Sequence, residues 1–400
     1  MSLLDDAIWW HVYPLGALGA PIRDSREHEV VHRLPRLDAW LDHAVKLGCS
    51  GILLAPIFAS ESHGYDTLDH FAIDPRLGDA ADFEHFMTQC RARGLNVMLD
   101  GVFNHVSARH PRAFELARRT DSGEVEVWEG HSDLVNLDHS KEAVADLVTE
   151  VMCHWLRAGI AGWRLDVAYA VPASFWRNVI SRVRAEFPDA LFLGEVIHGD
   201  YAQIVADSAM DTLTQYEMWK SVWSSIKDRN FWELAWNLER HGEFCEAFVP
   251  QTFIGNHDVT RIASAVGRDG AALAAVILMT LPGMPSIYYG DERAFTGDKG
   301  EGLGADDALR PELPSDPSEL AADGEPMQRL YQELIGVRRR NPWIARGRVR
   351  VLGKDLEWID YAVADSDGER VLSVSLDLRS GVSARIDDAS GAEIFRWSGV

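Results

Sequence analysis

The sequence has little of what several common functions require. Its four cysteines lie far apart and show no metal-binding or redox spacing, so we interpret them as free thiols in a reducing compartment. Basic residues are scarce, with 39 Lys and Arg against 62 Asp and Glu and a net charge of -23. This charge argues against nucleic acid as a partner, because phosphate binding needs a basic face. It is compatible with a neutral ligand. The four cysteines are Cys49, Cys90, Cys153 and Cys245.

Targeting features are also missing from the first residues. The stretch Met-Ser-Leu-Leu-Asp-Asp has no basic region and is not followed by a long apolar run. A signal peptide needs both, and a membrane span needs about 20 apolar residues. We therefore expect no signal peptide, no membrane association and a cytoplasmic location.

Short apolar runs alternate with amphipathic stretches of helical length through most of the chain. The chain has 400 residues, of which 46% are hydrophobic, enough for one large domain and a small one. Eight runs with helical patterns between them predict an α/β fold, a (β/α)8 TIM barrel. The predicted strands are 7–13, 51–55, 96–100, 162–166, 191–195, 210–214, 251–255 and 286–289, and the clearest helical patterns are 37–47, 81–93, 141–158 and 174–186.

Three segments depart from this alternation. The acidic, polar stretch 106–139 is too long for an ordinary connection, and predicts a short inserted domain after strand three. Residues 303–326 are rich in Asp, Pro, Ala and Gly and predict a long loop. From about residue 348, strand-like runs follow one another without helices, which predicts a small antiparallel β-domain. We expect the barrel to comprise 1–105 and 140–345, the insert 106–139, and the C-terminal β-domain 346–400.

The segment Gly162-Trp163-Arg164-Leu165-Asp166 carries the most chemical information. Side chains alternate along a strand, so Arg164 and Asp166 face the same side. A guanidinium beside an Asp lowers the pKa of the carboxyl group and keeps it ionised. An ionised carboxylate at the end of a buried strand suits a glycosidase nucleophile. The alternative is a structural ion pair that caps the strand.

Polar residues also follow three other predicted strands. Barrel enzymes place their chemistry at the C-terminal ends of strands, so these groups are expected on one rim. Taken singly, each has an ordinary explanation as a turn, a helix cap or a satisfied loop histidine. Their joint occurrence in this order favours a catalytic site. The groups are Asp100 with Asn104 and His105, Glu195 after Gly194, and His257 with Asp258 after Gly255-Asn256.

Together these four segments resemble the four short sequence regions of the α-amylase superfamily of glycoside hydrolases. The stretch from Arg164 to Trp176 is most similar to the cyclomaltodextrinase and neopullulanase group, and so are His63-Gly-Tyr-Asp-Thr67 and Ile287-Tyr-Tyr-Gly-Asp-Glu292. The resemblance implies a retaining hydrolase of α-1,4-glucosidic bonds in maltooligosaccharides, including cyclic or branched dextrins. That group usually carries an extra N-terminal domain. Because strand one is predicted at 7–13, we expect this domain to be absent.

The resemblance also implies a role for each site residue. Asp166 resembles the nucleophile, and Glu195 the general acid/base, which must be protonated to donate to the leaving oxygen. Asp258 resembles the third carboxylate, which holds sugar hydroxyls and favours ring distortion. The expected substrate-binding residues are Arg164, which orients the nucleophile, His105 and His257, which bond the sugar, Tyr65, which stacks on it, Asp66, which supports the site, and Asp100.

No cofactor or metal is predicted. The chemistry needs only carboxylates, and the calcium site of many α-amylases uses a His at the position of Ala170. Asn104 is present, but a carboxamide alone makes no site for a hard cation. Carboxylates of the insert, such as Asp133 or Asp138, could complete one.

Two other functions remain open at this point. A transglycosylase or an isomerase of the glucanotransferase or trehalose synthase type uses the same intermediate. An inactive, superfamily-derived binding protein is a further alternative. The run Trp219–Trp236 holds four Trp, which indicate either helix packing or a platform for leaving-group sugars. The expected partner is an α-glucan oligosaccharide, and the sequence predicts no oligomeric state.

Overall fold

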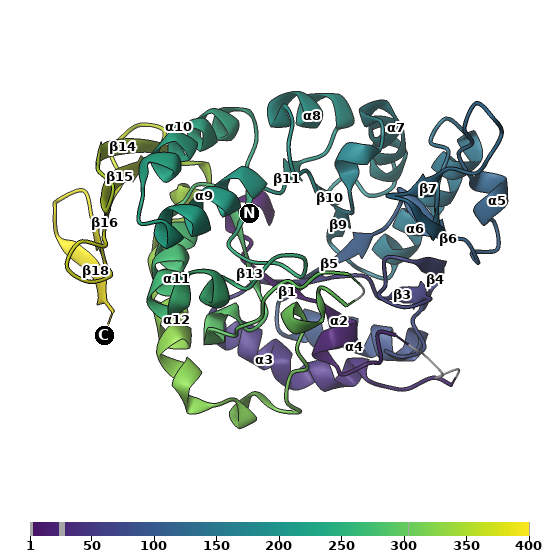
Figure 1. The fold of residues 1–400 in the computed structure, drawn as a ribbon, viewed down its shortest axis with the longest axis horizontal. Coiled ribbons are helices and arrows are strands. Elements are labelled where there is room, and N and C mark those ends of the chain that lie inside the picture. Colours follow the sequence, from purple (N-terminus) through teal and green to yellow (C-terminus); the bar gives the residue numbers. More distant parts are fainter. Residues whose placement is uncertain (1–2, 24–28, 303, 400) are drawn as a thin grey trace.

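Eight parallel strands form a closed ring at the centre of the molecule (Figure 1). In the computed structural model, which describes residues 3–23, 29–302 and 304–399, their order is β11-β10-β9-β5-β2-β1-β13-β12. A parallel bridge between Thr214 and Gln251 joins the two ends of this order. The predicted barrel is thus confirmed, and each predicted strand overlaps an observed one. The strands are β1 (Trp9–Val12), β2 (Gly51–Leu54), β5 (Asn96–Gly101), β9 (Gly162–Leu165), β10 (Leu191–Gly194), β11 (Thr212–Leu213), β12 (Gln251–Phe253) and β13 (Met284–Tyr288).

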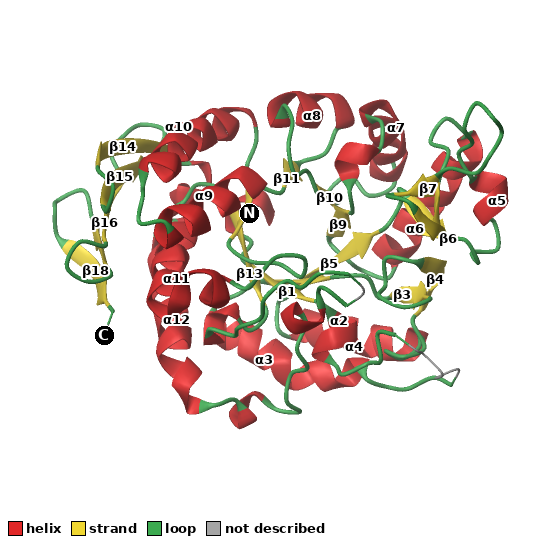
Figure 2. Cartoon of the chain, viewed as in Figure 1, coloured by secondary structure: helices red, strands yellow, loops and turns green. Residues whose placement is uncertain are grey.

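Helices surround the ring, and side-chain alternation along each strand divides the core in two (Figure 2). Trp9 points inward and belongs to a small cluster with Leu53 and Met98. Trp10 points outward and stacks on Trp40 of α3, with ring centroids 6.0 Å apart. The helices are α1 (Leu3–Asp6), α2 (Pro14–Ala17), α3 (Asp38–Leu47), α4 (Ala80–Ala92), α6 (Glu142–Arg157), α7 (Ala173–Arg184), α8 (Tyr201–Ser208), α9 (Tyr216–Lys227), α10 (Trp232–Ala247), α11 (Ile262–Thr280) and α12 (Glu325–Arg340).

The helix α11 is long and apolar enough, by length and composition, to cross a membrane. Its second half, from Gly270 to Thr280, is buried throughout. The helix packs against α9 and α12, and its backbone is kinked at Gly267. These contacts identify it as a core helix of the barrel.

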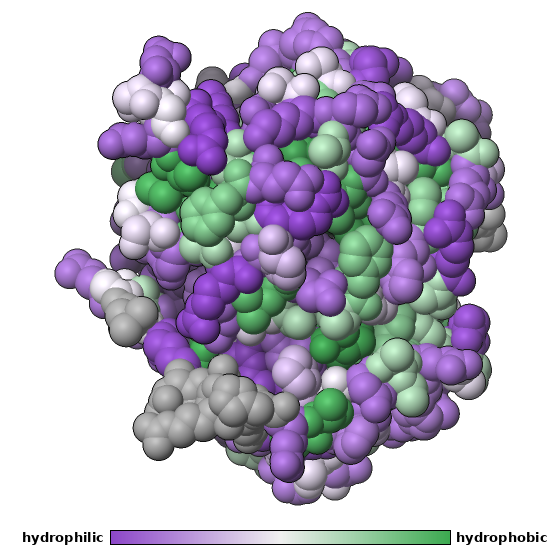
Figure 3. All heavy atoms as spheres, turned by 90° about the vertical axis from the view of Figure 1, so that its right-hand side faces the viewer, coloured by the Kyte–Doolittle hydropathy of each residue, from purple (hydrophilic) through white to green (hydrophobic). Residues whose placement is uncertain are grey.

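Two small sheets lie at the rim on the right of Figure 1. The predicted insert contains β6 (His105–Ser107), α5 (Ala113–Leu116), β7 (Val127–Trp128) and β8 (His131–Asn136), with sheet order β6-β8-β7. The sequence did not predict the hairpin of β3 (Phe58–Ser60) and β4 (Thr67–Ile73), whose loop carries Tyr65. Hydrophilic side chains cover most of this side of the molecule, with smaller apolar areas between them (Figure 3).

The C-terminal part forms the predicted antiparallel sheet, at the left of Figure 1. Its strands are consecutive, and its first strand packs on α10. Of the predicted loop 303–326, residue 303 lies outside the described residues. The remainder contains three short 3-10 helices, Asp307–Leu309, Pro317–Glu319 and Ala322–Gly324. The C-terminal strands are β14 (Arg348–Lys354), β15 (Trp358–Ala364), β16 (Val371–Asp377), β17 (Ser383–Asp387) and β18 (Glu393–Ser398).

Candidate active site

Strand register brings Arg164 to the centre of a carboxylate cluster. Asp100 of β5 and Arg164 of β9 are paired in the parallel ladder, so both point into the top of the ring. The Nη1 atom of Arg164 lies 2.5 Å from Asp100 Oδ2 and 3.2 Å from Asp166 Oδ1. Its Nη2 atom lies 2.6 Å from Glu195 Oε1. One buried guanidinium therefore bridges three strand ends.

The carboxylate of Glu195 is held by two further donors. The Tyr216 hydroxyl donates to Oε1 at 2.9 Å, and the backbone N–H of Val167 donates to Oε2 at 3.0 Å. Asn256 in turn donates to the Tyr216 hydroxyl at 2.8 Å. Tyr216 is the first residue of α9, so this helix fixes the position of Glu195.

The backbone at Val167 is left-handed, with φ 39° and ψ 43°. This conformation is costly for a β-branched residue, by about 1–3 kcal/mol. It turns the chain sharply after Asp166 and directs the Val167 N–H at Glu195. The hydrogen bond from the Val167 N–H to Glu195 therefore links the ends of β9 and β10.

Arg310 holds a fourth carboxylate, Asp258. Its Nη2 atom lies 3.0 Å from Asp258 Oδ1, and its Nε donates to the carbonyl oxygen of His257 at 3.0 Å. Its guanidinium also lies 4.4 Å from the centroid of the Tyr13 ring. The other oxygen of Asp258, Oδ2, lies 2.9 Å from His257 Nε2. Asp258 is thus fixed from both sides.

Tyr65 connects the two halves of the cluster. Its hydroxyl donates to Asp100 Oδ2 at 2.9 Å and also contacts His257 Nε2. Its ring lies parallel to that of His257, with centroids 5.4 Å apart. His105 Nε2 lies 3.0 Å from the carbonyl oxygen of Tyr65, so His105 positions this loop in the structure. Asp66 is buried, and Ser62 donates to its Oδ2.

Burial and charge set the protonation of the carboxylates. Burial, followed by the neighbouring Glu195, raises the pKa of Asp166 well above its usual value, and Arg164 does not compensate. Arg164 does lower this pKa, as expected, but the net shift is upward. The expectation that Arg164 keeps Asp166 ionised was wrong, because it ignored the loss of solvation and the second carboxylate. Asp258 differs. Burial acts to raise its pKa, but His257, Arg310 and Arg164 outweigh it and lower the pKa.

Metal-binding groups do not converge at this rim in the described part of the chain. There, the one group of three His, Cys, Asp or Glu whose ligand atoms lie within 4.8 Å of one another is His32, Asp79 and Asp82. Asp79 and Asp82 already form the capping box of α4. Asn104, which the sequence analysis considered for a cation site, contacts His105 Nδ1 through its Nδ2 atom at 3.2 Å.

The structure thus joins seven of the predicted residues through direct contacts, and His105 adjoins them through the Tyr65 backbone. The sequence did not predict three further residues that contact this cluster. Val167 and Tyr216 have no sequence pattern that marks them. Arg310 has a weak one, since it is the only basic residue between positions 300 and 324. The seven are Tyr65, Asp100, Arg164, Asp166, Glu195, His257 and Asp258.

A (β/α)8 barrel with this cluster of carboxylates at its rim occurs in a known protein family. The sequence profile described as "Alpha amylase, catalytic domain" matches residues 37–129 and 119–347, and the chain belongs to the Alpha-amylase family. Among curated relatives, it is 30% identical over 378 residues to a cyclomaltodextrinase of Geobacillus thermopakistaniensis, covering 86% of this chain and 62% of the relative. It is 29% identical over 283 residues to an intracellular maltogenic amylase of Bacillus subtilis, covering 64% of this chain and 48% of the relative.

A solved structure has the same fold over nearly the whole chain. It is the cyclic α-maltosyl-(1→6)-maltose hydrolase from Arthrobacter globiformis in complex with that cyclic sugar, with a TM-score of 0.81 at 22% identity and coverage of 98% of both chains. The chain spans 62–63% of the length of the first curated relatives it matches.

Proposed function

We propose that the protein is a retaining α-glucan hydrolase that cleaves α-1,4-glucosidic bonds of maltooligosaccharides, including cyclic or branched dextrins. The observation that carries this proposal is the set of contacts that Arg164 makes with Asp100, Asp166 and Glu195 at the C-terminal rim of the barrel. Relatives named cyclomaltodextrinase, neopullulanase and maltogenic α-amylase support the substrate class.

Asp166 is the proposed nucleophile and Glu195 the proposed acid and base. Cleavage of a glycosidic bond passes through an oxocarbenium-like state, which needs negative charge beneath the sugar ring. Asp166 supplies this charge and attacks the anomeric carbon, while Glu195 protonates the leaving oxygen. Glu195 then removes a proton from water, and the water displaces Asp166 from the sugar. Two inversions give net retention.

The proton that Glu195 donates to the leaving oxygen must reach Glu195 before the bond is cleaved. In the substrate-free protein, Glu195 accepts bonds from Tyr216 and Val167, whereas Asp166 has a raised pKa. The raised pKa favours the protonated form of Asp166 in the substrate-free protein. When the sugar binds, the proton must lie on Glu195, so we propose that the leaving oxygen draws it there.

Asp258 has a separate proposed role. The charges around it lower its pKa, so it remains ionised while the pair exchanges its proton. An ionised carboxylate accepts hydrogen bonds from sugar hydroxyls and does not compete for the catalytic proton. With Tyr65 and His257, it would bind the glucosyl unit that reacts.

A single product panel tests the proposal. Purified protein is incubated with maltotriose, maltoheptaose, β-cyclodextrin, pullulan and trehalose, and the products are separated. Net release of glucose or maltose from the maltodextrins supports hydrolysis. Longer oligosaccharides would indicate a transglycosylase, maltose formed from trehalose would indicate an isomerase, and no product at all would indicate a binding protein. The similarity to an intracellular amylase supports the cytoplasmic location that we also propose.

A further inference from the structure

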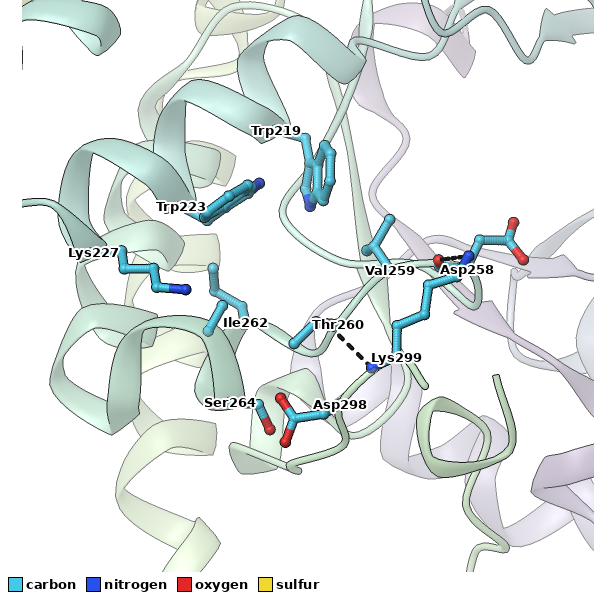
Figure 4. A pocket seen from close by; sticks show the side chains of 11 residues that line it. Trp219, Trp223, Lys227, Asp258, Val259, Thr260, Ile262, Ser264, Asp298 and Lys299 are labelled. Carbon is cyan, nitrogen blue, oxygen red and sulfur yellow. Dashed lines mark hydrogen bonds between the residues drawn. The ribbon is translucent and has the colours of Figure 1, made fainter. Parts of the chain in front are cut away.

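A pocket of about 490 Å³ lies beside Asp258 (Figure 4). It is bounded by α9 on one side and by the start of α11 and the loops after β12 and β13 on the other. Trp219 and Trp223 reach into it from α9, and Lys299 lies across from them, bonded to the backbone carbonyl oxygen of Asp258. Its volume falls in the range of about 300–1,000 Å³ that small-ligand sites occupy. The catalytic roles described above do not use it.

The wall formed by α9 is a row of aromatic rings. Trp219 and Trp223 are four residues apart and therefore lie on one face of the helix, and Tyr216 precedes them by three residues. Trp219 is held in place by Phe253, which stacks on it at 6.4 Å, and by Tyr216, which meets it edge-on at 5.8 Å. Both Trp side chains are only half-buried. The row begins at Tyr216, whose hydroxyl donates to Glu195, and continues through Trp219 and Trp223 into the pocket.

The polar lining is balanced in charge. Lys227 and Lys299 are accompanied by Asp298, and Lys299 Nζ lies 3.4 Å from Asp306 Oδ1, although the whole chain carries a net charge of -23. Such a lining suits a neutral ligand, since a phosphorylated one requires an excess of cations.

We propose that this pocket binds a second glucosyl unit of the α-glucan, with Trp219 and Trp223 as its stacking platform. Flat apolar rings cover the C–H faces of a sugar, and the surrounding polar groups bond its hydroxyls. The ligand is named from the proposed function, so the inference rests on it. It also decides between the two interpretations of the Trp219–Trp236 run. Trp219 and Trp223 bind sugar, while Trp232 is more than half exposed on α10 and lies outside this pocket.

Trp223 gives the cleaner test. Trp219 also lines a second pocket with Ile197 and Trp236 on the side of Glu195, whereas Trp223 borders only the first of these two. The variant Trp223→Ala is compared with Trp223→Phe, which keeps a ring, and with Trp232→Ala as the matched control. The ratio of kcat/KM for maltoheptaose to kcat/KM for 4-nitrophenyl α-glucoside is measured for each. This ratio is independent of the fraction of folded enzyme.

The expected result is a fall of about three- to tenfold in this ratio for Trp223→Ala, the range that aromatic stacking gives. Trp223→Phe should recover most of the loss, and Trp232→Ala should equal the wild type. A ratio unchanged in Trp223→Ala would overturn the inference while leaving the proposed hydrolase intact.

Calorimetric titration of maltoheptaose separates the two proposals further. It is carried out on Glu195→Gln, with and without Trp223→Ala. A Kd weakened about three- to tenfold by Trp223→Ala supports the sugar pocket, even if the wild type proves to hydrolyse nothing. An equal Kd in both proteins contradicts the pocket.

Discussion

Replacing Arg310 by Met tests the charge arrangement around Asp258. The change removes the contact at 3.0 Å with Asp258 Oδ1, the bond to the His257 carbonyl oxygen and the contact with the Tyr13 ring. A hydrogen bond to a charged group contributes about 1.5–3 kcal/mol. The Asp258 side chain is 34% exposed, so water replaces part of this energy and the lower end of the range applies. We expect kcat/KM to fall about 10- to 30-fold, since each factor of ten is about 1.4 kcal/mol.

The pH dependence distinguishes this mechanism from simple loss of structure. Arg310 is one of the charges that lower the pKa of Asp258, so its removal raises that pKa. The pKa of the Asp258 carboxyl group, followed by carbon-13 NMR of the labelled carboxylates, should therefore be higher in Arg310→Met than in the wild type. Arg310→Lys, which keeps the charge, should move it less. Arg23→Met serves as the matched control, because Arg23 forms an exposed pair with Asp307 of the same loop. An Asp258 pKa that is unchanged in Arg310→Met would refute the reasoning, whatever the loss in rate.

Three further predictions follow from the same arrangement. Asp166→Asn and Glu195→Gln should each lower kcat on maltoheptaose by on the order of a thousandfold or more, and activity above a tenth of wild type would disprove the assignment. Asp166→Asn should also raise Tm at pH 7: the raised pKa of Asp166 means that its stabilising protonated form is lost as pH rises through that pKa, and Asn is neutral at every pH, so a lower Tm by calorimetry would argue against it. Exhaustive EDTA treatment should leave activity and Tm unchanged, because the proposed mechanism uses carboxylates alone; a Tm that falls on chelation and recovers with calcium would reveal a structural metal, since a ligand bound only by the native state stabilises that state.

Much of the fold and part of the site could be predicted because their determinants are local. Each barrel strand is a short apolar run, and the residues at its end lie at the rim regardless of what the rest of the chain does. Asp100, Arg164 and Glu195 could therefore be brought together from their positions on three strands alone. Parallel pairing of Asp100 with Arg164 then completes what the alternation of side chains implies.

The remainder depends on contacts that no local pattern encodes. Arg310 lies in a loop without periodicity and reaches Asp258 across 52 residues of sequence. Tyr216 reaches Glu195 only because α9 begins where it does, and Val167 contributes through its backbone. The prediction that Asp166 is ionised was wrong for a related reason. A neighbouring Arg can be read from the sequence, whereas the burial that outweighs it is a property of the whole fold.

The double displacement through Asp166 is tested most directly by trapping its intermediate. The wild-type protein is incubated with 5-fluoro-α-glucosyl fluoride, which slows both steps but releases fluoride without needing an acid. The protein is then digested at low pH and its peptides are sequenced by mass spectrometry. We predict one added fluoroglucosyl group, on Asp166, and α-configured first products from maltoheptaose by proton NMR. A label on another residue, or β-configured products with no label, would contradict the proposed mechanism.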